Sequence, residues 1–179
     1  ASQLGLWDWD LTTDKVYHSR LKPLFGMPED AVPSMLEDLR PLVHPADVTM
    51  VRKTLAQHMK NKTVAYRMEY RVRHADGHWL WVEDSGRAVE RDADGRVLRM
   101  IGTRRDISAR KLQDEQAQLS ATVFEASSEG IFILSPALDI LAVNQAYSVI
   151  TGLQQQDAVG RNILELSGSD ELRQQFLHL

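Results

Sequence analysis

Residues 64 to 73 read Val-Ala-Tyr-Arg-Met-Glu-Tyr-Arg-Val-Arg, and this stretch decides the fold class. Every second residue is apolar, and the residues between them are mostly charged. A period of two places all the apolar side chains on one face of a β-strand. The stretch therefore predicts a long antiparallel strand with one buried face.

Two Asp-Gly turns extend this strand into a meander. Asp76-Gly77 leads into a strand expected over residues 78 to 90, and Asp94-Gly95 leads into another over residues 96 to 107. Asp-Gly pairs accept the positive φ that tight hairpins need. We therefore expect three long antiparallel strands in succession.

The residues before the meander predict a second hairpin and several helices. Residues 4 to 10 and 15 to 19 have strand patterns separated by the turn Thr12-Thr13-Asp14. Helical patterns occupy Arg20 to Phe25, residues 29 to 44, and Pro45 to Lys60. The longest of them has an apolar face formed by Val48, Val51, Leu55 and Met59. The fold class is therefore α+β, with an antiparallel five-stranded sheet flanked by short helices and one long helix.

A connector helix follows the last strand, and Ser108 is expected to cap its N-terminus. Leu112, Leu119 and Val123 recur at the spacing of a helical seam. The seam is short, and Gln116 interrupts it between Leu112 and Leu119. Two explanations stay open, because a longer seam is needed to identify a coiled coil. The helix either packs on its own domain or pairs with a second copy through these three residues.

The strand and helix order then begins again. Residues 130 to 152 repeat the order of residues 5 to 26, and Asp157-Ala158-Val159 repeats Asp30-Ala31-Val32. An internal repeat indicates a second copy of the same structural unit. The second copy reaches Leu179 before any long helix or meander, so we expect the incomplete start of a second domain.

Several short motifs occupy defined places in this order of elements. They are Leu6-Trp7-Asp8-Trp9-Asp10, Leu24-Phe25-Gly26, Val43-His44-Pro45-Ala46-Asp47, Glu69-Tyr70-Arg71, Trp81-Val82, and the run from Gly102 to Lys111. In this arrangement they resemble a PAS domain with its trailing PAC segment. Residues 121 to 166 resemble the beginning of another PAS domain.

The resemblance implies a PAS/PAC domain at residues 1–107, a helical linker at 108–127 and the N-terminal part of a second PAS domain at 128–179. It implies a sensory or regulatory module of a bacterial signal-transduction protein, which relays a signal through its C-terminal helix to an output domain in the same polypeptide. The motifs are similar to those of proteins that turn over cyclic di-GMP through GGDEF or EAL domains, and of histidine kinases. A cofactor-free scaffold for dimerisation or protein interaction is the alternative, and a homodimer is expected.

Composition excludes several function classes. The chain has no cysteine, which removes disulfides, thiolate metal sites and photochemistry based on a cysteinyl–flavin adduct. The net charge of -4 lacks the basic footprint of a nucleic-acid binder. No apolar run approaches the ~20 residues that span a bilayer, so we expect a cytoplasmic fragment without direct membrane contact, and a membrane anchor elsewhere in the parent protein stays open.

Catalytic and metal sites are not predicted. The chain has no nucleophile elbow, phosphate-binding glycine loop or HExxH motif, so we expect a regulatory fragment and not an enzyme. The acidic pair Glu83-Asp84 is interpreted as solvated charge. His74 and His78 flank a turn, but two histidines without a carboxylate make a weak metal site.

A ligand pocket is expected between the sheet and its helices. Its candidate residues are mostly aromatic or sulfur-containing, together with one histidine on the long helix: Trp9, Phe25, His58, Tyr66, Met68, Trp81 and Met100. Core packing explains the same aromatic residues, so absence of a cofactor is the first expectation. A haem ligated by His58, a redox-sensing flavin and a small colourless ligand stay open, with His58 otherwise expected to be a surface or partly buried histidine.

The signal relay is expected at Asp106, Ile107 and Ser108, where the last strand meets the connector helix. In the PAS family this aspartate often pairs with a basic group on the sheet, and Arg71, Arg73, Arg104 and Arg105 are candidates. A carboxylate there also lies near the positive end of the helix dipole. We therefore predict that Asp106→Asn or Ile107→Ala uncouples signalling in the full-length protein.

Overall fold

The computed structural model describes residues 4–20, 22–27, 40–60 and 65–166. The chain forms two compact units, Ala1–Leu112 and Gln113–Leu179. The helical turns expected at residues 29 to 39 lie outside the described residues, as does Val64. None of the helices in the described part is both long and apolar enough to cross a bilayer.

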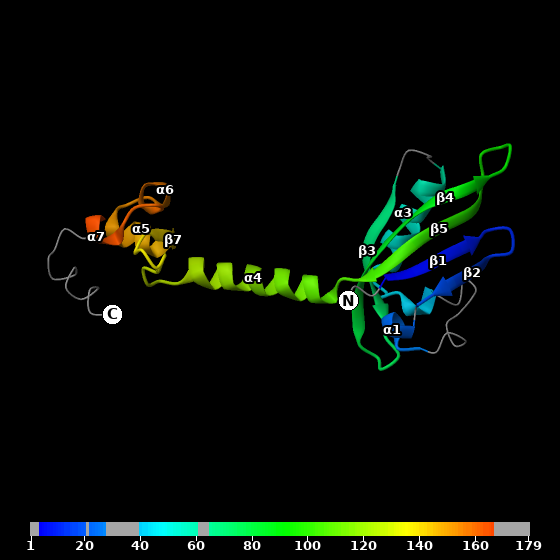
Figure 1. The fold of residues 1–179 in the computed structure, drawn as a ribbon, viewed down its shortest axis with the longest axis horizontal. Helices are drawn as coiled ribbons and strands as arrows, with labels where there is room; N and C mark the ends of the chain where they lie inside the picture. Colours follow the sequence, from blue (N-terminus) through cyan, green and yellow to red (C-terminus); the bar gives the residue numbers. More distant parts are fainter. Residues whose placement is uncertain (1–3, 21, 28–39, 61–64, 167–179) are drawn as a thin grey trace. The chain divides into compact units, whose positions relative to one another are not determined.

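The first unit contains a five-stranded antiparallel sheet in the order β2-β1-β5-β4-β3. Its strands are β1 (Leu4–Asp10), β2 (Lys15–Ser19), β3 (Tyr66–Arg73), β4 (Trp79–Arg91) and β5 (Val97–Asp106). The alternating stretch that decided the fold class forms β3, and its apolar residues are buried. The predicted fold class is confirmed, and Figure 1 shows the strands side by side.

The described residues of the first unit form the helices α1 (Lys22–Phe25) and α3 (Val48–Lys60) and the 3-10 helix η2 (Arg40–Leu42). Val51, Leu55 and Met59 of α3 pack against the core of the sheet. The helix begins at Val48 and not at Pro45, which corrects the prediction. Its first backbone hydrogen bond runs from the Val51 N–H to the Asp47 carbonyl.

Trp7 crosses the sheet on its buried face. The register places His18, Trp7, Gly102, Gly86 and Tyr66 in one row across the five strands. A Cβ at Gly102 would overlap both the Trp7 ring and the Ser85 carbonyl oxygen. The two glycines therefore let the indole lie against the strand backbones, where its ring meets Tyr66 edge-on at 5.8 Å.

The connector helix is α4 (Ser108–Ala126). As far as residue 166, the second unit then contains the antiparallel pair β6 (Phe132–Leu134) and β7 (Ile140–Val143), followed by three short helices. These are α5 (Gln145–Thr151), α6 (Gln155–Ala158) and α7 (Ile163–Leu166). Their order repeats β1, β2 and α1, so the predicted internal repeat is confirmed among the described residues.

Asn144 holds the start of the second unit together. It is 1% exposed, and its Oδ1 accepts the backbone N–H groups of Ile131 and Tyr147. Its Nδ2 donates to the carbonyl oxygens of Phe124 and Glu129. The side chain thereby caps α5 and fixes the chain that leaves α4.

Candidate functional site

A buried polar cluster, the Asp84 network, joins Trp7, Tyr70, Asp84 and Arg104 inside the first unit. Asp84 Oδ1 accepts the indole N–H of Trp7 at 2.6 Å. Its Oδ2 accepts the Tyr70 hydroxyl at 2.8 Å and the Arg104 guanidinium at 2.6 and 3.2 Å. The carboxylate is therefore fully engaged by donors, one of which carries the balancing charge.

The interpretation of Asp84 as solvated charge is wrong, because this residue is 1% exposed. Strand alternation explains its position. Asp84 stands between Val82 and Gly86 on the face of β4 that points into the core, whereas Glu83 points the other way. A buried carboxylate requires a paired cation and hydrogen bonds, and Arg104 and Tyr70 provide both.

Burial also fixes the protonation of the aromatic hydroxyls in this region. Burial raises the pKa of Tyr70 well above its ordinary value of 10.0, and the same effect raises the pKa of Tyr66. Burial alone lowers the pKa of Arg104, but the Asp84 carboxylate beside it outweighs this effect and raises the pKa overall. Tyr70 therefore stays neutral, and its hydroxyl donates a hydrogen bond to Asp84.

A cavity of about 50 Å³ adjoins the Asp84 network. Among the described residues it is lined by Trp7, Trp9, Val16, His18, Leu55, Tyr66, Asp84 and Arg104. Trp9 and Tyr66 of the predicted pocket residues line it, whereas Phe25, Met68 and Met100 are buried in the surrounding core. This space suits a few water molecules, since pockets for organic ligands usually enclose ~300–1,000 Å³.

His58 is only 4% exposed, which corrects the prediction of a surface or partly buried residue. Its Nε2 accepts the Ala88 N–H at 3.3 Å, just beyond the last described pair of β3 and β4, Tyr66 with Gly86. The ring thus supplies an acceptor to β4 where the described pairing with β3 ends. The position was recognisable in the sequence, because His58 follows Leu55 by three residues and Val51 by seven.

Trp81 lies on the opposite face of the sheet from the cavity, so its prediction as a pocket residue is wrong. The residue next to it, Val82, is fully buried, and strand alternation therefore turns Trp81 outward. The Arg71 guanidinium lies 5.2 Å from its ring centroid, and Lys111 Nζ lies 4.9 Å from it. Trp81 therefore contacts the start of α4.

The predicted relay residues form a junction between β4, β5 and α4. Asp106 Oδ1 accepts the Ser108 N–H at 2.7 Å, and Ser108 Oγ accepts the Trp81 N–H at 3.0 Å. The N–H of Ile107, which is 4% exposed, donates to the Trp81 carbonyl at 2.9 Å. The first turn of α4 is thus tied to β4 by backbone and side-chain hydrogen bonds.

Two expectations about the junction need correction. Ser108 was expected to cap the helix, but its hydroxyl binds β4, and the Asp106 carboxylate accepts the N–H at the start of the helix instead. Asp106 was expected to pair with an arginine of the sheet. Three of the four candidates pair with other carboxylates: Arg71 with Asp47, Arg104 with Asp84, and Arg105 with Glu83.

Glu69 of β3 adds an ionic clamp to the junction. Its carboxylate lies 2.7 Å from Lys111 Nζ and 2.5 Å from Arg110 Nη2. Hydrogen bonds from Lys111, and then from Arg110, lower the pKa of Glu69 from its ordinary value of 4.5. Since β3, β4 and β5 all contact the first turn of α4, a change in the sheet has a direct path to the helix.

The predicted seam residues of α4 are exposed. Leu112, Leu119 and Val123 have exposed fractions of 55%, 59% and 70%. The described residues therefore leave this apolar stripe open to a partner. Pairing with a second copy stays a prediction.

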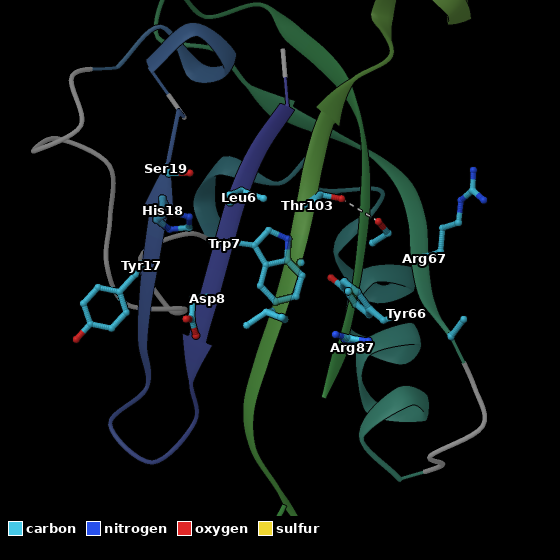
Figure 2. Close-up of a pocket in the computed structure, with 15 residues that line it drawn as sticks. Leu6, Trp7, Asp8, Tyr17, His18, Ser19, Tyr66, Arg67, Arg87 and Thr103 are labelled. Atoms are coloured by element: carbon cyan, nitrogen blue, oxygen red, sulfur yellow. Dashed lines mark hydrogen bonds between the residues drawn. The ribbon is translucent and has the colours of Figure 1, made fainter. Parts of the chain in front are cut away.

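A broad trough crosses the outer face of the sheet, and the sequence reasoning missed it (Figure 2). It encloses about 810 Å³, and its lining includes Leu6, Tyr17, Ile101, Thr103 and Arg67. Leu6 and Tyr17 are 52% and 61% exposed. The available signal was the apolar character of outward positions in β1 and β2, which alternate with the buried ones.

Comparison with known proteins identifies the fold family. Two sequence profiles described as PAS fold match the chain, one over residues 16–104 and the other over residues 119–178. An uncharacterized protein from Pseudomonas chlororaphis is 36% identical over 90 residues. That match covers 49% of this chain and 35% of the relative, so the chain spans well under two thirds of it.

Solved structures place the fold among sensory proteins. A sensory box histidine kinase/response regulator from Burkholderia thailandensis has a TM-score of 0.58 and 29% identity, over 66% of this chain and 88% of that one. The N-terminal domain of a diguanylate cyclase with PAS/PAC sensor from Marinobacter aquaeolei has a TM-score of 0.54 and 28% identity, over 60% and 98%. The chain belongs to the PAS family, and its fold is that of PAS sensor domains in signalling proteins.

Proposed function

We propose that this chain is a regulatory PAS module that passes a signal through α4 to an output domain of the same polypeptide. The observation that carries the proposal is the junction, where the first turn of α4 is bonded to β4 and β3. A PAS domain with a loosely attached helix would have no such path.

The Asp84 network and the junction share two neighbouring strands. The register pairs Asp84 with Arg104 and, two residues along each strand, Val82 with Asp106. Any change in the core that shifts β4 against β5 therefore displaces the residues that hold α4. Closely packed strands transmit such shifts because protein interiors have little free volume.

The output that we propose is turnover of cyclic di-GMP by a GGDEF or EAL domain. Support comes from the likeness to the diguanylate cyclase sensor and from the motifs that begin the second repeat. A histidine kinase output is the alternative, supported by the likeness to the sensory box kinase. Either output uses cytoplasmic nucleotides, so we place the module in the cytoplasm.

The decisive experiment changes the junction in the parent protein and measures its output activity. Ser108→Ala removes the hydroxyl that accepts the Trp81 N–H without opening a cavity. It is sharper than Ile107→Ala, which also removes a buried side chain. We expect Ser108→Ala to shift output activity while the thermal unfolding of the PAS domain changes little.

A control is Asp8→Asn, because the exposed Asp8–Arg99 pair on β1 and β5 is distant in the sheet register from α4. This control should leave output unchanged. Equal output from wild type and Ser108→Ala would contradict the relay. Product assays for cyclic di-GMP and for phosphohistidine in the same preparations separate the two proposed outputs.

The relay is proposed to operate as a homodimer and without a haem or flavin. The exposed stripe of Leu112, Leu119 and Val123 on α4 supports pairing of two copies. Light scattering should give a dimer mass that Leu119→Asp reduces to a monomer, and a monomeric wild type would contradict the pairing. An absorption spectrum of the purified protein tests for haem or flavin directly.

A scaffold that binds another protein is the second candidate function. The trough on the outer face, with its exposed Leu6 and Tyr17, is the observation that favours it. Under this hypothesis Tyr17→Ala alters assembly with the partner, whereas Ser108→Ala has no effect on output. The two functions are therefore separable by the same pair of variants.

A further inference from the structure

The hairpin between β3 and β4 brings two histidines and a carboxylate together. The His74 N–H donates to the His78 carbonyl at 2.9 Å, and the Gly77 N–H donates to the His74 carbonyl at 2.9 Å. Gly77 has a φ of +97°, which closes this short loop. The two imidazole rings consequently stack, with centroids 4.5 Å apart.

Asp76 at the tip of the loop turns its carboxylate back toward both rings. Its Oδ1 lies 2.9 Å from His74 Nδ1, also contacts His78 Nδ1, and accepts the His78 N–H at 3.1 Å. The ligand atoms of the three residues all lie within 4.8 Å of one another. The assumption that these histidines lack a carboxylate is therefore wrong.

One carboxylate oxygen thus faces two imidazole nitrogens. Each nitrogen carries a lone pair unless it is protonated, so the three atoms need shared protons or a shared cation between them. His74 Nδ1 also lies 3.4 Å from the Asp76 N–H, in position to accept it, which favours a lone pair on that nitrogen.

His74 is held in place on its other side. A Cβ at Gly26 would overlap His74 Nε2, so the ring packs directly against this glycine, whose φ is +68°. The Ala75 N–H also donates to the Phe25 carbonyl at 2.8 Å, which ties the loop to the end of α1. His74 therefore presents Nδ1 to Asp76 from a fixed position, while the side chains of His78 and Asp76 are exposed and have room to adjust.

We propose that His74, Asp76 and His78 form a binding site for one divalent first-row metal ion, with Zn²⁺ as the representative case. Two imidazole nitrogens and one carboxylate oxygen suit zinc, and water fills the remaining coordination positions. Bonds of ~2.0–2.2 Å to a tetrahedral ion place ligand atoms about 3.3–3.5 Å apart, so only a small closing or opening of the loop is needed. The ion would clamp the β3–β4 hairpin beside the end of α1.

The test is calorimetric titration of ZnCl₂ into chain that carries no histidine tag and has been freed of metal with a chelator. We expect one site per chain, with affinity at least ~10-fold weaker in Asp76→Asn, His74→Ala and His78→Ala. Zinc should also raise the melting temperature of wild type and not of Asp76→Asn, because an ion that binds the folded state stabilises it. Tryptophan fluorescence checks that each variant folds, and His78→Ala is the safest since its side chain is half exposed.

The chain provides two matched controls. The other Asp-Gly turn, at residues 92 to 95, has an aspartate that accepts a backbone N–H but no histidine, so Asp92→Asn should leave zinc affinity unchanged. His44→Ala removes a histidine that contacts Trp79 outside the cluster, and it should also be neutral. Zinc affinity that is equal in wild type and the three cluster variants would overturn the proposal, as would the absence of saturable binding to wild type.

Discussion

The two units begin with the same order of two strands and a short helix, but they stabilise that order differently. In the first unit β1 pairs with both β2 and β5, and Trp7 of β1 reaches the charged pair of Asp84 and Arg104. In the second unit the described sheet has two strands, and a neutral amide, Asn144, makes four hydrogen bonds to backbone groups. The larger unit buries a salt bridge, whereas the smaller one buries none of its charges in the described part.

This difference shows what a complete sheet permits. A buried charge is tolerated only when paired and hydrogen-bonded, and the partners of Asp84 come from three strands, β1, β3 and β5. The described part of the second unit offers one pair of strands. With so few neighbouring strands, the amide of Asn144 can hold the loop because it both donates and accepts hydrogen bonds without burying a charge.

The largest predicted effect is Asp84→Ala in the first unit. The substitution leaves Arg104 buried without its carboxylate and leaves the Trp7 and Tyr70 donors unsatisfied. Removing one partner of a buried ion pair costs ~3–5 kcal/mol, so we expect the free energy of unfolding to fall by that amount. All four tryptophans lie in Ala1–Leu112, so their fluorescence during urea denaturation reports this unit.

The adjacent residue supplies the control. Glu83 bonds to Arg67 and Arg105 on the outer face, where the two arginine side chains are 68% and 47% exposed. Glu83→Ala should therefore cost about 1 kcal/mol or less. Similar losses from the two variants would show that Asp84 does not hold the core together.

Asn144→Ala should be the next largest effect, confined to the second unit. The change leaves two N–H groups, of which that of Tyr147 is buried, and two carbonyl oxygens without their partner. Unsatisfied buried groups cost ~1–3 kcal/mol, so amide exchange should accelerate across β6, β7 and α5. The unfolding of the first unit, followed by tryptophan fluorescence, should be the same as in wild type. A change in both the fluorescence transition and the amide exchange would mean that the two units unfold together.

The sequence was sufficient to predict the sheet, because alternation in β3 and the two Asp-Gly turns are local signals. The repeat in the second unit was likewise visible in the order of its elements. The same alternation also specified the inward position of Asp84 and the outward position of Trp81. Both predictions were wrong because an acidic residue suggests exposure and an aromatic residue suggests burial, whereas position in the strand decides which face each side chain takes.

Long-range pairings could not be predicted from local patterns. The Trp7–Asp84 hydrogen bond joins residues 77 positions apart, and Arg110 meets Glu69 across 41 positions. Excluding Arg71, Arg104 and Arg105 as partners of Asp106 required the strand register, which a single sequence does not provide. The metal-type cluster was different, since His74, Asp76 and His78 are separated by one residue each, and only the turn of the carboxylate toward the rings was unknown.

The smallest effect concerns the link between the first unit and α4, and it depends on pH. Bonds from Lys111 and Arg110 lower the pKa of Glu69 in the folded chain below its ordinary value of 4.5. The clamp therefore stabilises the junction fully above about pH 4.5 and loses this contribution as the pH falls through the lowered pKa.

We expect amide exchange at the start of α4 to rise in acid in wild type. In Glu69→Gln this amide exchange should be faster than in wild type already at neutral pH. The free energy of local opening should fall by no more than ~1 kcal/mol, because these side chains are partly exposed. Identical pH profiles for the two proteins would show that the clamp does not hold α4 to the sheet.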